Sequence, residues 1–193
     1  MTLIKKSCLN LLFIGNSHTY YNDMPLMVQR RAVDALYDCR VTMIAHGGWY
    51  LDQHVVEPDV RFNILYGGFD YVILQEHAHP FGPEERFLEA AKALNAMIRE
   101  AGCTPVIYEC WAKRNEPEAQ ALMNEVHRRV AAEIDALLAP VGENWWEHMR
   151  SHPQLIMYAH DGAHASPEGS GFAANILWET IRRDLNRREG ESE

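Results

Sequence analysis

The sequence predicts a three-layer α/β/α fold with a central, mostly five-stranded parallel sheet. Short apolar runs alternate with segments of helical periodicity along all 193 residues, and parallel strands need crossover helices between them. No linker, repeat or low-complexity segment interrupts this alternation, and the length is typical of one domain. We therefore expect residues 1–193 to form a single domain, with a frayed, charged tail from about residue 187.

The expected strands are mostly apolar runs, which are typical of strands covered on both faces, with a β-rich run as the second. The runs lie at residues 9–14, 40–45, 71–74 and 105–108, with a fifth, short strand expected at 138–141. The first run follows two lysines and so resembles a signal peptide. No small-residue cleavage site comes after it, and we interpret it as a strand.

Helical periodicity and capping signals place helices between these strands. The helix starts are expected at Asn22 or Asp23 before Pro25, at Pro83, at Pro117, and at Ser166 before Pro167. Shorter helical pieces are expected between residues 51 and 65. In the helix that begins at Pro117, the buried face is expected to comprise Leu122, Val126, Val130, Ile134 and Leu137.

Composition excludes several classes of function. There are 18 basic and 27 acidic side chains, so the net charge is 18 − 27 = −9, which argues against nucleic acid as a partner. No apolar run approaches the roughly 18 residues of a membrane span. The four cysteines show no metal-ligand spacing and are expected to be reduced thiols in a cytoplasmic protein. We expect no cofactor and a small-molecule substrate.

Polar and titratable residues follow each expected strand. In open α/β sheets, ligands bind at the carboxyl ends of the strands, so these residues are the candidates for a functional site. They are residues 15–19 (Gly-Asn-Ser-His-Thr), 46–49 (His-Gly-Gly-Trp), 75–77 (Gln-Glu-His), 109–111 (Glu-Cys-Trp) and, before the last helix, 161–164 (Asp-Gly-Ala-His).

Three of these residues suit nucleophilic catalysis. Ser17 follows Gly15 in a tight strand-to-helix turn that would project its hydroxyl into the cleft. His18 is adjacent to Ser17, and adjacent side chains diverge, so His164 is the better candidate for the base. Asp161 lies three residues before His164 and can accept a hydrogen bond from its Nδ1–H. That bond would leave Nε2 free to take the serine proton.

An oxyanion hole is expected from groups of the same strand ends. The backbone N–H groups of Ser17 and Gly48 are suitable donors, since glycine permits close approach of a ligand to the backbone. The side-chain amide of Gln75 is a candidate for a third donor, and the sequence leaves His77 or the backbone groups alone as alternatives.

These motifs resemble those of the SGNH (GDSL-like) hydrolases over nearly the whole chain. That family has Gly-Asp/Asn-Ser after the first strand, a glycine after the second, and Asp-x-x-His near the C-terminus. These blocks are matched here by residues 15–17, by Gly48 with Gly47 as the alternative, and by residues 161–164. Its third block, Gly-x-Asn-Asp, is replaced by Leu-Gln-Glu-His at 74–77, which is similar to a less characterised branch. The resemblance implies a flavodoxin-like fold and hydrolysis of carboxylic esters, including acetyl esters of carbohydrates or other small molecules, with Gln75 in place of the asparagine.

Each motif also has a purely structural interpretation. Ser17 can cap the first helix, Asp161 can form a turn with the glycine after it, and Gly48 can serve only the turn after its strand. A structural role is the stronger interpretation for Glu76. The sequence assigns no role to His18.

Two other functions compete with a serine esterase. One is a metal-dependent hydrolase, because histidine and carboxylate suit zinc; its ligands would come from His77, His79, His160 and His164. The other is a non-catalytic α/β binding module, since a fold does not fix its function.

Overall fold

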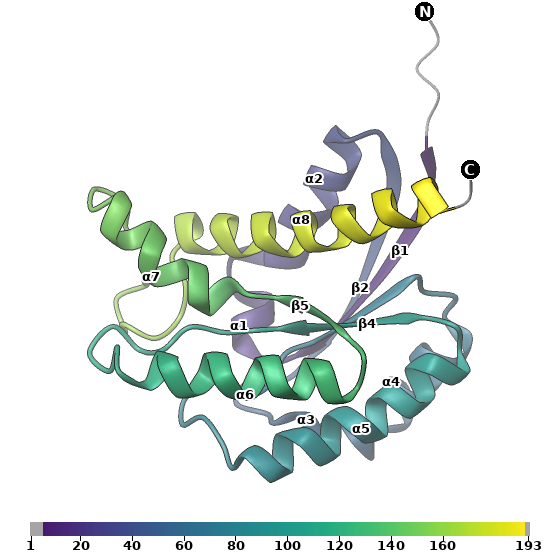
Figure 1. The fold of residues 1–193 in the computed structure, drawn as a ribbon, viewed down its shortest axis with the longest axis horizontal. Coiled ribbons are helices and arrows are strands. Elements are labelled where there is room, and N and C mark those ends of the chain that lie inside the picture. The colour runs from purple at the N-terminus through teal and green to yellow at the C-terminus, as the bar shows by residue number, and fades with distance from the viewer. Residues whose placement is uncertain (1–5, 192–193) are drawn as a thin grey trace, which may run out of the picture.

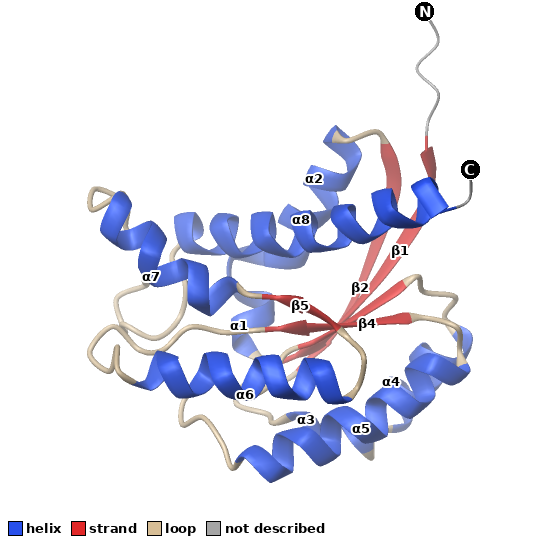
Figure 2. Ribbon diagram, in the orientation of Figure 1, coloured by secondary structure: helices blue, strands red, loops and turns tan. Residues whose placement is uncertain are grey.

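A computed structural model describes residues 6–191 as a parallel sheet between two layers of helices (Figures 1 and 2), which confirms the predicted fold class. The five strands pair in the order β2-β1-β3-β4-β5. They are β1 (Lys6–Gly15), β2 (Tyr37–Ala45), β3 (Tyr71–Leu74), β4 (Thr104–Tyr108) and β5 (Leu137–Ala139). Each of the five expected strands corresponds to one of these.

Two groups of helices cover the two faces of the sheet (Figure 1). One face carries α2 (Met24–Asp34), α7 (Val141–Ser151) and α8 (Pro167–Glu191). The other carries α3 (Leu51–Val55), α4 (Pro58–Tyr66), α5 (Glu84–Glu100) and α6 (Ala119–Glu133). A short helix, α1 (Ser17–Tyr20), and a 3-10 turn (Tyr21–Asp23) link β1 to α2. Each helix layer packs its apolar side chains onto the sheet, so there are two cores.

The strand order predicts a crevice beside the polar segments that follow β1, β2 and β3. The order reverses between β1 and β3, and ligands of open α/β sheets bind at such switch points. Ile14 is level with Ile44 of β2 and with Leu74 of β3. The segments that follow these three strands therefore emerge side by side at one edge of the sheet.

The expected buried face of α6 is partly wrong. Leu122 is exposed, whereas Met123, Val126 and Val130 are buried. Successive residues at spacing four drift by about 40° around a helix, so a face centred near Val130 leaves Leu122 at its border. Leu137 lies beyond the helix and begins β5.

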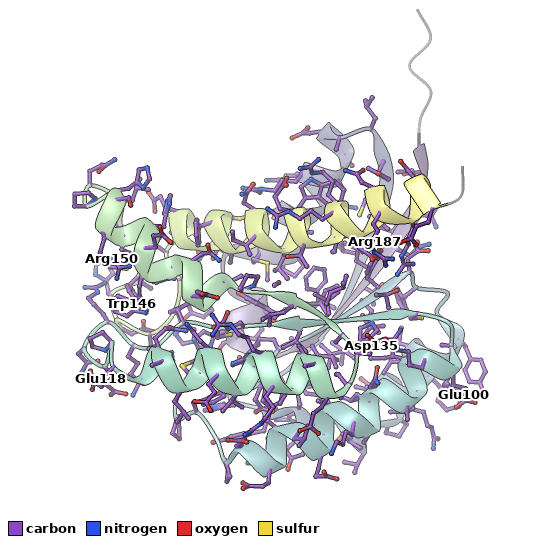
Figure 3. All side chains as sticks on the ribbon, viewed as in Figure 1. Glu100, Glu118, Asp135, Trp146, Arg150 and Arg187 are labelled. Atoms are coloured by element: carbon purple, nitrogen blue, oxygen red, sulfur yellow. The ribbon has the colours of Figure 1, made fainter. Side chains whose placement is uncertain are left out.

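One chain segment differs more strongly from expectation. Residues 141–151 form α7, which the sequence analysis did not anticipate, and β5 ends at Ala139. Apolar and aromatic residues of α7 fill the core, and Trp146 donates from Nε1 to Gln120 Oε1 at 3.1 Å (Figure 3). The charged tail continues α8 as far as Glu191, while 192–193 lie outside the described residues.

The starts of the second and last helices were predicted with different success. Ser166 caps α8, since its Oγ accepts a hydrogen bond from Gly169 N at 3.0 Å. Asp23 precedes α2, but its side chain makes no capping hydrogen bond. Asn22 instead donates its side-chain amide to the Ala165 carbonyl at 3.0 Å. It thereby ties the start of α2 to the segment that carries His164.

Candidate active site

The turn after β1 presents the Ser17 hydroxyl at the edge of the sheet. Asn16 is the N-cap of α1, because its side chain accepts a hydrogen bond from His18 N at 3.0 Å. Ser17 is therefore not needed as a cap, and its hydroxyl has another partner. The turn also requires Gly15: a Cβ there would lie 2.5 Å from Thr19 Oγ1 and 2.6 Å from Gln75 Oε1.

Ser17, His164 and Asp161 form a continuous chain of hydrogen bonds across 147 residues of sequence. Ser17 Oγ lies 2.8 Å from His164 Nε2, and His164 Nδ1 lies 2.5 Å from Asp161 Oδ2. The other carboxylate oxygen of Asp161 accepts hydrogen bonds from Ala163 N and His164 N, each at 2.9 Å. This is the geometry in which a base can take a proton from a serine hydroxyl while a carboxylate holds the imidazole in place.

The surroundings of Asp161 favour its ionised form. Partial burial raises the pKa of this carboxyl, but hydrogen bonds from the His164 side chain and from the Ala163 and His164 amides outweigh burial and lower the pKa to about 2. Asp161 is therefore ionised throughout the neutral range. It supplies the negative charge that an imidazolium at His164 would need.

Aromatic rings hold the His164 imidazole. Tyr21 stacks on it with ring centroids 4.1 Å apart and an angle of 10°, and His18 stacks at 4.9 Å and 29°. Burial lowers the pKa of His18 far below its ordinary value, as do the neighbouring histidines. A neutral His18 beside His164 avoids repulsion when His164 becomes protonated.

A pocket of about 330 Å³ opens over the Ser17 hydroxyl. It is lined by Asn16, Ser17, His18, Gly48, His77, His79, Lys113, Ala163 and His164. Gly48 has a φ of +74°, a conformation that favours glycine. Ser17 and Gly48 thus come to one pocket, as expected for donors to an oxyanion.

Gln75 lies beneath the turn and does not line this pocket. It is 1% exposed, and its Oε1 accepts hydrogen bonds from Asn16 N and Thr19 Oγ1, both at 2.9 Å. Its Nε2 donates to the Glu76 carbonyl. The expectation of a third oxyanion donor at Gln75 needs correction: the amide already has partners inside the protein and holds the nucleophile turn in place.

Glu76 joins two of the loops at the edge of the sheet. Its carboxylate accepts hydrogen bonds from Leu51 N at 3.3 Å and from His77 N at 2.6 Å. Burial raises its pKa to about 7, although both backbone hydrogen bonds oppose this. Glu76 therefore has a structural position between the segment that follows β2 and the segment that follows β3.

A second cavity, of about 580 Å³, lies beside the first. Tyr21, which stacks on His164, lines this cavity together with Arg114, Tyr158 and His160. His160 is thus separated from the pocket that His77 and His79 line. Among residues 6–191, no group of three or more His, Cys, Asp or Glu side chains is arranged to hold a metal ion.

Comparison with solved structures places the fold of this chain in a known superfamily. An SGNH-assigned protein from Slackia heliotrinireducens is 28% identical, with a TM-score of 0.78 over 90% of this chain and 99% of that one. The chain belongs to the SGNH hydrolase superfamily. The esterase EstA from Pseudoalteromonas (12% identity, TM-score 0.68, 92% and 98% covered) and a carbohydrate esterase family 3 protein from Talaromyces cellulolyticus (12%, 0.70, 93% and 99%) share the fold. No family model and no curated protein matches the sequence.

Two pocket residues of this superfamily member were missed by the sequence analysis as parts of the serine site. Lys113 follows β4, just beyond the Glu-Cys-Trp run at 109–111, and that position at a strand end was the signal that could have found it. His79 was considered only as a metal ligand. Both line the pocket above Ser17. Among residues 6–191, no helix is long and apolar enough to cross a membrane.

Proposed function

We propose that this SGNH superfamily member is a serine esterase that hydrolyses carboxylic esters with small acyl groups. The chain of hydrogen bonds from Ser17 Oγ through His164 to Asp161 carries the proposal, because it opens onto the same pocket as Gly48. The superfamily relatives include enzymes named as esterases, which supports ester hydrolysis as the reaction class.

Acylation follows from the positions of these groups. His164 Nε2 takes the proton from Ser17 Oγ as the oxygen attacks the ester carbonyl carbon, and the carbonyl electron pair moves onto its oxygen. The tetrahedral intermediate then collapses, the bond to the alcohol oxygen breaks, and His164 returns the proton to that oxygen. Asp161 stabilises the imidazolium between the two transfers and keeps Nε2 directed at Ser17.

Deacylation repeats the sequence with water. His164 Nε2 takes a proton from a water molecule, whose oxygen attacks the carbonyl carbon of the acyl-serine. Collapse of the second intermediate breaks the bond to Ser17 Oγ, which recovers a proton from His164. The products are a carboxylic acid and an alcohol, and the enzyme is unchanged.

The oxyanion is assigned to the backbone N–H groups of Ser17 and Gly48. Donors that are fixed in advance stabilise the developing charge without reorganisation, and one such donor contributes about 10²- to 10³-fold in kcat. The pocket of about 330 Å³ suits a small acyl group. The backbone donors support ester hydrolysis, and the size of the pocket supports short-chain esters, including acetyl esters of carbohydrates, as the substrate class.

The first test compares hydrolysis of 4-nitrophenyl acetate, butyrate and octanoate by the wild type and by Ser17→Ala. We expect turnover that falls from acetate to octanoate, and a loss of about 10⁴-fold or more in kcat for Ser17→Ala, because no other group can carry the acyl intermediate. Ser151→Ala, an exposed serine on α7, is the matched control. Equal activity of the wild type and Ser17→Ala would overturn the mechanism.

A further inference from the structure

The pocket above Ser17 is lined by a positive charge and by no negative charge among the described residues. Among the described residues that line it, Lys113 is the one side chain with a permanent charge, and no carboxylate lines it. Asp161 lies behind His164 and is paired with it. The chain as a whole carries a net charge of −9, so it repels anions at long range. A local cation that lines such a pocket is suited to an anionic group on the substrate.

The same pocket contains buried imidazole nitrogens that have no partner in the protein. His79 Nε2 and His18 Nε2 are both inaccessible and make no hydrogen bond, and their rings lie 5.0 Å apart. His18 is 8% exposed. A buried polar atom without a partner is unfavourable. Both rings belong to residues that line the pocket, so a small ring rotation on binding would bring such a nitrogen to a ligand there.

Lys113 and His79 line the same pocket and can bind the same group of a ligand. Burial, and after it the charge of Lys113, lower the pKa of His79 to about 4. His79 is therefore neutral near pH 7 and carries one N–H, which it can donate to an acceptor. A carboxylate between the two groups would accept from the Lys113 ammonium and from His79, and both bonds would be favourable.

We propose that Lys113 and His79 form a subsite for a carboxylate carried by the ester substrate. The inference rests on the proposed esterase function and narrows its substrate to esters that bear a second, acidic group. A carboxylate is the chemistry that suits one ammonium and one neutral imidazole N–H. The pocket therefore distinguishes such esters from neutral esters of the same length.

Glu116 is the existing partner of Lys113 and must be weighed against this subsite. Its Oε1 lies 3.3 Å from Lys113 Nζ, and both side chains are partly exposed, at 47% and 36% respectively. Exposed ion pairs of this kind are weak. Lys113 can thus exchange Glu116 for a substrate carboxylate that enters the less exposed pocket, where the attraction is less screened by solvent.

The test uses two pairs of substrates that differ by one charge. On the acyl side, mono-4-nitrophenyl adipate is compared with 4-nitrophenyl hexanoate; on the alcohol side, 4-acetoxybenzoate is compared with its methyl ester. Selectivity is the ratio of kcat/KM for the charged ester to that for the neutral ester. A ratio that favours the acid in the first pair places the carboxylate on the acyl group, and in the second pair on the alcohol.

Variants then link the selectivity to the subsite. We expect Lys113→Met to lower the favoured ratio about tenfold, mainly through KM, and Lys113→Arg to retain most of it. His79→Leu is expected to lower the ratio by a smaller factor. Lys92→Met removes the same charge from the exposed surface of α5 and should leave the ratio at the wild-type value. No preference for the acid in either pair, or an equal loss in Lys92→Met, would overturn the subsite.

A binding measurement separates this inference from the proposed function. Adipate is titrated into Ser17→Ala, and the ring signals of His79 are followed by NMR as a function of pH. Bound carboxylate should raise the pKa of His79, and Lys113→Met in the same background should remove the effect. Because no turnover is needed, adipate binding with no esterase activity would reject the esterase alone. Esterase activity without adipate binding would reject the subsite alone.

Discussion

Two regions of the site, which we call the mouth and the floor, shift the pKa values of their carboxyl groups in opposite directions. The mouth is the loop of residues 159–166 with Asp161, whose side chain is 45% exposed and whose pKa is lowered to about 2. The floor consists of Gln75, Glu76 and Glu109, each at most 2% exposed. Burial raises the pKa of Glu76 to about 7 and that of Glu109 to about 8.

The difference shows which physical effect decides in each place. At the mouth, burial is the largest single influence on the pKa of Asp161, but three hydrogen bonds to the ionised carboxylate together outweigh it. On the floor, loss of water outweighs the few hydrogen bonds that the carboxyl groups receive. The mouth is thus built for a charge that catalysis uses, and the floor for fixed positions that hold the strand ends together. Substitutions at the mouth should change turnover, and those on the floor should change stability.

Asp161→Asn should have the largest effect. We expect kcat to fall about 10³- to 10⁴-fold, because an amide can donate to His164 Nδ1 and thereby favour the tautomer that cannot accept the Ser17 proton. The melting temperature should change by less than about 2 °C, since the side chain is partly exposed and retains an oxygen for the loop amides. Turnover of 4-nitrophenyl acetate and thermal unfolding measure the two.

The exposed Asp34 offers a matched control for the same chemical change. Asp34→Asn should leave both quantities near the wild-type values. If Asp161→Asn lost less than tenfold in kcat while remaining folded, the carboxylate would not orient His164. The proposal that the mouth serves catalysis would then be wrong.

Gln75→Leu should act mainly on stability. The substitution leaves Asn16 N, Thr19 Oγ1 and the Glu76 carbonyl without their partner, and we expect the free energy of unfolding to fall by about 2–4 kcal/mol. Urea denaturation measures this loss. Thr19→Val removes one of the three hydrogen bonds and should lose about 1 kcal/mol.

Kinetics of the folded Gln75→Leu variant test the opposite assignment. If the Gln75 amide were an oxyanion donor, kcat would fall by about 10²- to 10³-fold with little change in stability. That result would make Gln75 an oxyanion donor and would contradict its assignment as a residue that holds the nucleophile turn in place. Thr19→Val then serves as the reference for a disturbed turn without a lost donor.

The contrast between these two regions also explains what could be predicted from the sequence. The strands and the candidate triad follow from local patterns: apolar runs, a glycine before Ser17, and the spacing of Asp161 and His164. The orientation of Gln75 does not, because a side chain directly after a strand can point into the pocket or under the turn. Its hydrogen bonds to Asn16 N and Thr19 Oγ1, which no spacing reveals, decide between the two.

Segments that depend on tertiary packing were predicted less well. Helix α7 begins directly after Pro140, where a run of apolar residues also suits a strand, and burial of Trp145 favours the helix. The charged end of α8 is helical as far as Glu191, and Asp184 within this helix is buried and accepts the Tyr71 hydroxyl at 2.8 Å. Fraying from about residue 187, which the charge indicates, stays a prediction.

Glu109→Gln should have the clearest dependence on pH. Burial raises the pKa of Glu109 to about 8, while the same group in the unfolded chain ionises near its ordinary value of about 4.3. The unfolded state therefore releases this proton first. The contribution of Glu109 to stability is full below about pH 4.3 and is lost as the pH rises toward 8. A glutamine stays neutral throughout. The stability of the variant relative to the wild type should therefore increase over this range, and its melting temperature should be a few degrees higher at pH 9.

Thermal unfolding at pH 5, 7 and 9 measures that gain as a difference between variant and wild type, which removes the titration of Glu76 common to both. Glu118 lies exposed before α6 (Figure 3), and Glu118→Gln corrects for the loss of one negative charge. A difference for Glu109→Gln that is constant with pH, or that shrinks as the pH rises, would mean that hydrogen bonds control this carboxyl as they control Asp161. The floor would then be electrostatically equivalent to the mouth, and burial would no longer account for the contrast between them.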